Sequence, residues 1–356
     1  MNALVRIDGM VDPHVHLRGL EWAHKGTFAS ETRAAVAGGY WAVLDMPNTA
    51  PSTVSAAALE HKLAEINAQA VCDWGLYFGA SQRMNQREYA GVVSRVAGLK
   101  MFNNATTGDL LLPDQPTRDA HYAAWPAEKL IVVHAEGETV AQILDLVRQY
   151  RKRTHFLHIS TAEEIGYLRA AKEDGLPVTI GVCPHHLWLT ERDIAVLGSK
   201  GLMKPELKTQ ADQDALWAAL QAGLVDVVES DHAPHTLEEK ASDKPPYGVP
   251  GLETTLPLLL TAVHEGRLTF EQVTNLIATN PRRIFGLTCP DGTYTTVELN
   301  SEYVISGHAL HTQCQWSPFE GMRVRGKVRE TWIRGVQVYD GERVLVEQGF
   351  GQNLYG

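Results

Sequence analysis

Short apolar runs separated by longer amphipathic stretches recur along the chain. These runs are rich in valine, isoleucine, leucine and aromatic residues, as expected of strands buried on both faces of a parallel sheet. They span residues 11–17, 41–46, 72–78, 98–102, 130–134, 154–158, 178–182 and 225–231. The stretches between them repeat apolar residues at helical spacing, and one opens with a capping-box pattern from Thr161 to Glu164. Strands and helices that alternate in this way predict an α/β fold, a (β/α)8 barrel of the TIM type.

The pattern changes towards the C-terminus. After helices expected at 252–264 and 270–276, strand-like runs separated by glycine-containing turns lie at residues 294–297, 327–333, 336–339 and 343–346. Residues 4–7 have the same character. We therefore expect a barrel over residues 10–290 and a small β subdomain formed by residues 1–9 and 291–356.

Composition narrows the class of protein. The chain is 44% hydrophobic and has a formal net charge of −10 with no Lys/Arg-rich run, which argues against binding to nucleic acid or a membrane surface. The strongly apolar stretch at 256–263 is too short to span a membrane, and the first residues show no secretory signal. The four cysteines form no CxxC pair, which is typical of reduced cysteines rather than a disulfide framework or a cysteine-based zinc site. We expect a cytoplasmic protein.

Metal-ligating residue types gather at the ends of the predicted strands, where barrel enzymes place their reactive groups. His14, His16, His134, His158 and Asp231 all fall at such positions. His14 and His16 are two residues apart, so on a strand both imidazoles share one face. A lone histidine is more often a packing residue, but five such residues at matching positions predict a metal centre. Neutral imidazoles with a carboxylate suit Zn²⁺.

Lys100 lies near the end of the fourth predicted strand. An ammonium facing a cluster of metal ligands would be repelled, whereas carbamylation by CO₂ converts it to a carboxylate that can bridge two metals. The alternative is a surface lysine whose aliphatic stem covers apolar neighbours. The residue alone leaves both interpretations open.

Longer motifs make the interpretation more specific. They are residues 12–18 (DPHVHLR), 46–49 (MPNT), 230–240 (SDHAPHTLEEK), 250–254 (PGLET), 280–285 (NPRRIF) and 318–321 (PFEG). Together with Lys100 and the histidines, they resemble the dihydroorotases of the amidohydrolase superfamily. The resemblance is to the dihydroorotase domain of the animal multifunctional pyrimidine-synthesis polypeptide in particular, and it runs from about residue 10 to residue 352.

The resemblance implies a zinc-dependent cyclic amidohydrolase that interconverts N-carbamoyl-L-aspartate and L-dihydroorotate in de novo pyrimidine biosynthesis. It implies two Zn²⁺ ions bridged by N6-carboxylated Lys100 and a hydroxide. One ion would be held by His14, His16 and Asp231, and the other by His134 and His158. The bridging hydroxide is expected to attack the ring carbonyl, with Asp231 as general acid and base.

The resemblance also implies substrate contacts. Arg18, Asn48 and His235 would hold the free carboxylate, and the backbone at Pro250-Gly251 would contact the ring. Thr106 lies on a loop expected to close over the site. The histidines at 185, 186 and 232 are interpreted as orienting or structural residues.

The chain departs from the animal domain at three places. Leu157 and Gly181 stand where that domain has a cysteine and a glutamate associated with a third zinc, so we expect two metals. Lys204 replaces a substrate-binding arginine, which keeps the charge but loses the planar fork. Thr107 replaces a phenylalanine in the closing loop, as in the shorter bacterial dihydroorotases.

Two alternative functions stay open. Hydantoinase and allantoinase share the metal frame, but Arg18 with Asn48 favours a substrate with an α-carboxylate, which a plain hydantoin lacks. An inactive dihydroorotase-like scaffold that holds aspartate transcarbamoylase is the other; such homologues have typically lost metal ligands that are present here. The resemblance further implies a homodimer, with aspartate transcarbamoylase as a candidate partner.

Overall fold

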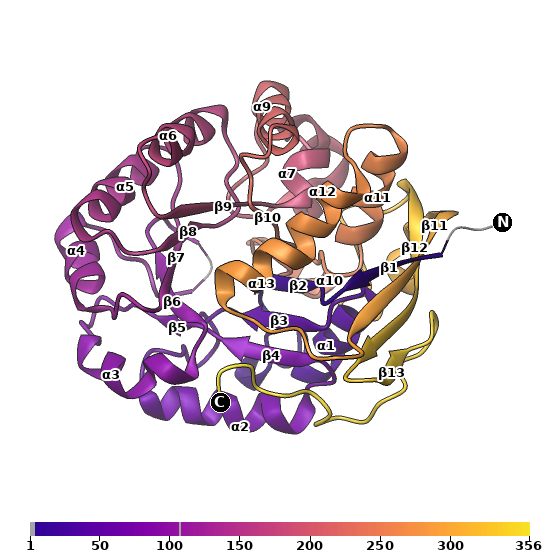
Figure 1. Ribbon diagram of the computed structural model, residues 1–356, viewed down its shortest axis with the longest axis horizontal. Coiled ribbons are helices and arrows are strands. Elements are labelled where there is room, and N and C mark those ends of the chain that lie inside the picture. Colours follow the sequence, from indigo (N-terminus) through magenta and orange to yellow (C-terminus); the bar gives the residue numbers. More distant parts are fainter. Residues whose placement is uncertain (1–3, 107) are drawn as a thin grey trace.

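The computed structural model describes residues 4–106 and 108–356, and it contains the predicted barrel of parallel strands surrounded by helices (Figure 1). The ring consists of β2 (Val11–Val15), β3 (Ala42–Asp45), β4 (Asp73–Leu76), β5 (Phe78–Gly79), β6 (Gly98–Phe102), β7 (Leu130–His134), β8 (Thr154–Phe156), β9 (Val178–Val182) and β10 (Val227–Val228). Strands β2 to β4 form one hydrogen-bonded sheet and β5 to β10 another. The ring closes where His16 N–H donates to His232 O at 2.7 Å, beside a parallel bridge between Val15 and His232.

The sequence pattern located the barrel strands well. β6, β7 and β9 have the predicted bounds. The third predicted run is divided at Tyr77, because its first part pairs with β3 and its second part with β6. The side chains of β6 and β7 are buried throughout, as expected of strands covered on both faces.

Helices cover the outside of the ring (Figure 1). They are α1 (Phe28–Ala37), α2 (Ala56–Gln69), α3 (Tyr89–Val92), α4 (Gln115–Ala124), α5 (Glu138–Tyr150), α6 (Ala162–Glu173), α7 (Pro184–Trp188), α8 (Ile194–Leu197), α9 (Gln210–Gln221), α10 (Leu237–Lys240), α11 (Thr255–His264), α12 (Phe270–Thr274) and α13 (Asn280–Phe285). The predicted capping box is present at the start of α6. Helix α11 starts later than predicted, because Thr254 N–H and Gly251 O first close a turn at 3.1 Å.

An antiparallel sheet lies beside the barrel, at the right of Figure 1. Its strand order is β1 (Leu4–Asp8), β11 (Tyr294–Val304), β12 (Arg323–Ile333) and β13 (Val336–Tyr339). The N-terminal strand β1 therefore pairs with β11 from the C-terminal part of the chain, with Leu4 opposite Glu298 and Asp8 opposite Tyr294. The strand predicted at 343–346 is wrong: the Asp340 carboxylate caps a tight turn there, and only Val344 forms a single bridge back to Tyr339.

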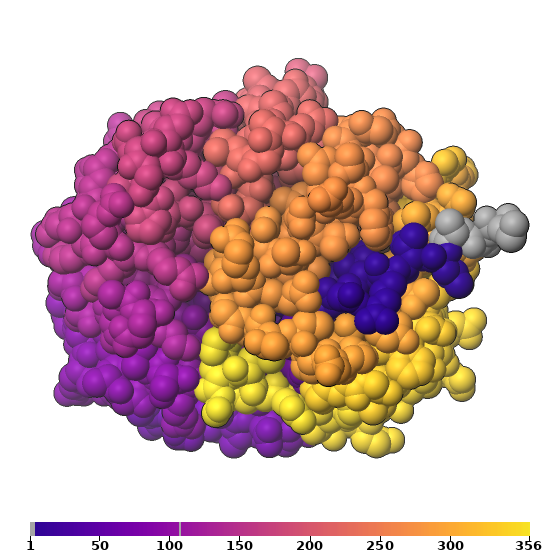
Figure 2. All heavy atoms as spheres, viewed as in Figure 1, coloured from indigo at the N-terminus to yellow at the C-terminus, as the bar shows by residue number. Residues whose placement is uncertain are grey.

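The C-terminal segment packs against the barrel, and Figure 2 shows it in yellow at the lower edge of the molecule. Gly351 N–H donates to Ala70 O at 2.9 Å, and Asn353 forms a parallel bridge with Trp74 of β4. Within the described residues, no helix combines the length and the apolar character needed to cross a bilayer.

Candidate active site

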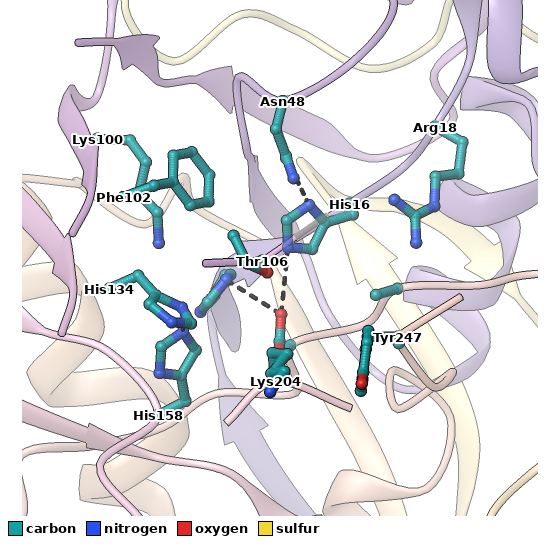
Figure 3. Close-up of a pocket in the computed structure, with 14 residues that line it drawn as sticks. His16, Arg18, Asn48, Lys100, Phe102, Thr106, His134, His158, Lys204 and Tyr247 are labelled. Atoms are coloured by element: carbon teal, nitrogen blue, oxygen red, sulfur yellow. Dashed lines mark hydrogen bonds and ion pairs between the residues drawn. The ribbon is translucent and has the colours of Figure 1, made fainter. Parts of the chain in front are cut away.

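The C-terminal ends of the barrel strands surround one pocket (Figure 3). Its walls are formed by His14, His16, Arg18, Asn48, Lys100, Phe102, Thr106, His134, His158, Lys204, Asp231, Ala233, Tyr247 and Gly248. The structure thus brings together every predicted site residue except His235, Pro250 and Gly251. Thr107, the loop position at which the chain departs from the animal domain, lies outside the described residues.

His14, His16 and Asp231 form the first cluster. Asp231 Oδ1 is 3.1 Å from His14 Nε2 and 3.2 Å from His16 Nε2. The donor atoms of the three residues lie within 4.8 Å of one another, and all three side chains are buried. Burial raises the pKa of Asp231, an effect that the nearby His14 and Lys100 oppose.

His134 and His158 form the second cluster beside the first. His134 Nδ1 lies 3.0 Å from His158 Nε2, and the ring centroids of His14 and His158 are 5.1 Å apart. Burial lowers the pKa of His14, His16, His134 and His158. All four rings are therefore neutral near pH 7, which is the form that binds a metal ion.

Lys100 is fully buried, which excludes the alternative of a surface lysine. Its Nζ has no hydrogen-bond partner within residues 4–106 and 108–356. Burial lowers the pKa of this amine to about 7, against the opposing effect of Asp231 and Glu229. A substantial fraction of the amine is thus unprotonated near neutral pH, and an unprotonated amine is the form that reacts with CO₂.

Two of the imidazoles have an oxygen acceptor on the nitrogen that points away from the clusters. Asn48 Oδ1 lies 2.8 Å from His16 Nδ1, and Glu136 Oε1 lies 2.9 Å from His134 Nε2. A proton on each outer nitrogen leaves the inner nitrogen with a lone pair directed into the pocket. Sequence reasoning assigned Asn48 to substrate and missed Glu136, although Glu136 stands only two residues after His134.

Three residues at the site have left-handed backbone conformations that residues other than glycine rarely adopt. The φ angles are 64° at Arg18, 36° at His158 and 47° at Asp231. Such conformations cost of order 1–3 kcal/mol each and persist where surrounding contacts hold them. Here the fold holds them at the turns that direct these side chains into the pocket.

Cationic side chains line another part of the pocket. Arg18 Nε donates to Pro234 O at 2.9 Å, and burial lowers its pKa to about 10, so it stays charged at neutral pH. Lys204 Nζ is 2.6 Å from Glu206 Oε1 and 4.8 Å from the centre of the Tyr247 ring. Two cationic side chains in the pocket favour a substrate that carries a carboxylate.

The structure places His235, Pro250 and Gly251 behind the pocket wall. His235 Nε2 is 3.0 Å from Arg18 Nη2, so this histidine contacts the arginine from behind. Gly251 N–H donates to His232 Nδ1 at 3.1 Å, and His232 Nε2–H donates to Glu31 at 2.8 Å. Tyr247 and Gly248 line the pocket instead, and no motif in the sequence singled them out.

Two further features were not predicted from the sequence: the grouping of Cys183 with the histidines at 185 and 186, and the position of Glu229. Cys183, His185 and His186 follow β9, and their donor atoms also lie within 4.8 Å of one another. Burial raises the pKa of the Cys183 thiol well above its ordinary value, so the sulfur is protonated. Glu229, directly after β10, is a fully buried carboxylate whose contacts reach His14 and His158.

Similarity to known proteins agrees with the family that the sequence motifs indicate. No model of a known protein family matches the chain. The dihydroorotase of Halobacterium salinarum is 35% identical over 96% of this chain and 88% of its own length. The chain belongs to the dihydroorotase family. The family resemblance of the sequence is thereby confirmed.

Longer relatives are also similar to this dihydroorotase-family chain. It is 44% identical over 99% of its length to the multifunctional protein CAD of Squalus acanthias, and 41% identical over 99% to the multifunctional protein pyr1-3 of Dictyostelium discoideum. The chain spans only 16% of each of these two proteins.

Solved structures confirm the fold. L-hydantoinase (dihydropyrimidinase) from Arthrobacter aurescens superposes with a TM-score of 0.93 at 25% identity, covering 99% of this dihydroorotase-family chain and 89% of that one. The inactive dihydroorotase-like domain of the Chaetomium thermophilum CAD-like protein superposes with a TM-score of 0.83 at 24% identity, covering 99% of both chains. The amidohydrolase-type barrel predicted from the sequence is therefore correct.

Proposed function

We propose that this chain catalyses the reversible cyclisation of N-carbamoyl-L-aspartate to L-dihydroorotate, with loss of water, in de novo pyrimidine biosynthesis. The observation that carries the proposal is the content of the pocket. It holds four neutral imidazoles, a buried lysine amine and the Asp231 carboxylate beside Arg18 and Lys204. The imidazoles, the amine and the Asp231 carboxylate suit the making and breaking of a cyclic amide. The two cations suit a substrate with a free carboxylate.

The residues present fit a pair of divalent cations, and we propose Zn²⁺. His14, His16 and Asp231 would hold one ion and His134 with His158 the other, with N6-carboxylated Lys100 between them. Two features support this fit: the buried Lys100 amine lacks a partner among the described residues, and the imidazoles are neutral. When bound, such a pair would lower the pKa of a water molecule in the pocket and would polarise the substrate carbonyl.

Asp231 is the proposed general acid and base. Its carboxylate sits between two imidazoles, and burial raises its pKa, which makes it a stronger base than an exposed aspartate. In ring opening it takes a proton from water and delivers it to the departing ring nitrogen. In ring closure it takes the proton of the ureido nitrogen.

The substrate carboxylate is assigned to Arg18 and Asn48, and Lys204 lines the pocket as a further cation. Arg18 can bind a carboxylate through two N–H groups, while Lys204 adds a point charge. His235 supports Arg18 through its contact with the guanidinium, and we propose that the backbone at Pro250-Gly251 contacts the substrate ring. We propose that Thr106, which lines the pocket, lies on a loop that excludes water when substrate is bound.

Turnover of three cyclic substrates tests the assignment. The purified protein with Zn²⁺ should open L-dihydroorotate and should act far more slowly on hydantoin and allantoin, because these lack the carboxylate that Arg18 binds. A preference for hydantoin would favour the hydantoinase-like alternative, which the similarity to L-hydantoinase keeps in view. No turnover at full metal loading would leave the inactive scaffold as the function.

Metal content is the companion measurement. We expect two ions per chain, held by the two histidine clusters of the pocket. A third ion would point to the Cys183–His185–His186 cluster, and it should disappear in Cys183→Ala while the other two stay.

We also propose a cytoplasmic homodimer with aspartate transcarbamoylase as a candidate partner. Support comes from the two multifunctional relatives, of which this chain spans 16%. Light scattering of the chain alone, and after mixing with aspartate transcarbamoylase, should give twice the chain mass and then a larger species.

A further inference from the structure

Glu229 is a buried carboxylate that the proposed mechanism does not use. It follows β10 and precedes Asp231 by two residues, and its side chain has no exposed surface. An ionised carboxylate in such a position is costly unless hydrogen-bond donors surround it. Its partners therefore indicate what it does.

The carboxylate connects three histidines. Oε1 accepts from His158 N–H at 2.8 Å and lies 3.6 Å from His14 Nδ1, while Oε2 lies 3.3 Å from His155 Nε2. His155 is itself buried, and its Nδ1 lies 2.8 Å from Thr179 Oγ1. Glu229 is thus held in place from β8 and β9, and it faces the outer nitrogen of His14.

The contact with His14 completes a pattern. His16 and His134 each have an oxygen acceptor, from Asn48 and Glu136, on the nitrogen that points away from the clusters. The outer nitrogen of His14, Nδ1, has no hydrogen-bond partner within the described chain, and Glu229 Oε1 lies 3.6 Å from it as an ion-pair contact. Its inner nitrogen, Nε2, faces Asp231 at 3.1 Å. Glu229 stands where the acceptor for His14 is needed.

The neighbouring strand leaves room for this carboxylate. A Cβ atom added to Gly181 of β9 would lie 2.5 Å from Glu229 Oε1 and 2.7 Å from its carboxyl carbon. No side chain fits at residue 181 while Glu229 occupies its present position. Gly181 and Glu229 are therefore complementary, which indicates a built position rather than incidental packing.

We propose that Glu229 is a positioning residue: it holds His14 in the Nδ1–H tautomer and fixes the backbone of His158, so that both imidazoles present lone pairs to the divalent cations. This inference rests on the proposed metal-dependent function. Outer carboxylates of this kind typically change metal affinity by about 10–100-fold. The negative charge of Glu229 also lies on the side of His14 remote from the cations and makes that ring a stronger donor.

The substitution Glu229→Gln tests the proposal because it keeps the size of the side chain and removes its charge. Both proteins are stripped of metal, and Zn²⁺ affinity is measured by competition with a chromophoric chelator while thermal unfolding of the metal-free proteins is followed. We expect nearly unchanged unfolding and about 10–100-fold weaker binding. Zn²⁺ affinity within about twofold of the unmutated protein would overturn the proposal, since a purely structural role predicts that glutamine restores it.

Glu31→Gln is the matched control. Glu31 is also fully buried and accepts from a histidine, but the ring of its partner His232 contacts the Gly251 backbone rather than a metal-binding side chain. Only the backbone of His232 meets the cluster, where its carbonyl accepts from His16 N–H. Its Zn²⁺ affinity should match that of the unmutated protein. An equal loss of affinity in both variants would contradict a specific role for Glu229.

A measurement on the unmutated protein covers the case in which Glu229→Gln does not fold. Ring ¹⁵N chemical shifts of His14, assigned by comparison with His14→Asn, should show a proton on Nδ1. A proton on Nε2 would overturn the proposal. Failure of the proposed function can be told apart from failure of this inference. A protein that binds Zn²⁺ in a way that depends on Glu229, yet does not open dihydroorotate, would contradict only the proposed function.

Discussion

At the scale of single residues, the site depends on which nitrogen of each histidine carries a proton. Asn48 and Glu136 accept from the outer nitrogens of His16 and His134. Burial keeps these rings neutral. The pocket therefore has directed lone pairs in advance of any ion, which lowers the cost of organising the site when metal binds.

Lys100→Ala should remove both metal bridging and activity. The change deletes the buried pocket amine that is proposed to become the carbamate. Turnover of dihydroorotate should fall to background, and zinc content should fall with it. Native mass spectrometry should detect one CO₂ adduct on the unmutated protein and none on the variant. A variant that retains two ions and full activity would contradict carbamylation of Lys100.

Lys204→Arg should improve substrate binding. Lys204 lies at the pocket wall, and a guanidinium would add a second N–H to a carboxylate that the ammonium meets as a point charge. We expect KM for dihydroorotate to fall by up to about tenfold, which corresponds to about 1.4 kcal/mol, with kcat within about twofold. Lys204→Met, which removes the charge, should raise KM. If both variants keep the original KM, Lys204 does not contact substrate.

At the scale of secondary-structure elements, the pocket is the place where strand ends and their following turns converge. The left-handed conformations of Arg18, His158 and Asp231 turn three different chain segments back over the barrel. Other segments near the barrel are hydrogen-bonded to parts of the chain that are distant in sequence. One such tie joins Glu253, just before α11, to the loop at residues 311–312, where Glu253 accepts from the backbone N–H groups of His311 and Thr312.

The contact between His311 and Glu253 should make stability depend on pH. Hydrogen bonding to Glu253 raises the pKa of His311 above its ordinary value of 6.5. The stabilisation is fully present below the unfolded-state pKa and is lost as pH rises through the higher folded-state pKa. His311→Gln should therefore lower the free energy of unfolding by about 1 kcal/mol at pH 6, and by less at pH 8 and above. Urea denaturation of both proteins across this range checks it; a gap that widens with pH would contradict the assignment.

At the scale of the whole molecule, one buried aspartate joins the barrel, the antiparallel sheet and the C-terminal segment. Asp73, at the start of β4, accepts from Trp41 Nε1 at 2.6 Å and from Gln352 N–H at 2.9 Å. Arg334, in the turn between β12 and β13, pairs with the same carboxylate at 2.5 Å. Segments far apart in sequence are thus locked at one point.

Arg334→Ala should destabilise the protein without altering its chemistry. Removal of the guanidinium leaves the Asp73 charge buried with its ionic partner gone, which typically costs about 3–5 kcal/mol. We expect a drop of about 3 kcal/mol in the free energy of unfolding, because Trp41 and Gln352 still donate to Asp73. kcat and KM should match those of the unmutated protein at a temperature where both are folded. A loss of Zn²⁺ affinity in the folded variant would contradict the separation of this contact from the pocket.

The sequence by itself determined the barrel, because strands buried on both faces must be apolar throughout and the helices between them must be amphipathic. It also located the candidate metal ligands, since His14, His16, His134, His158 and Asp231 each stand at a strand end that local pattern can identify. Even Lys100 was found in this way, although only its complete burial excluded a surface position.

Tertiary structure alone decided the partners of these residues. Nothing near Glu229 in sequence shows that it faces His14, because the contact depends on the space that Gly181 leaves on the adjacent strand. In the same way, the sequence did not indicate that Tyr247 and Gly248 line the pocket, because a loop's path depends on what it packs against. Sequence patterns report whether a side chain points inward, whereas the neighbour it meets is set by the closure of the whole ring.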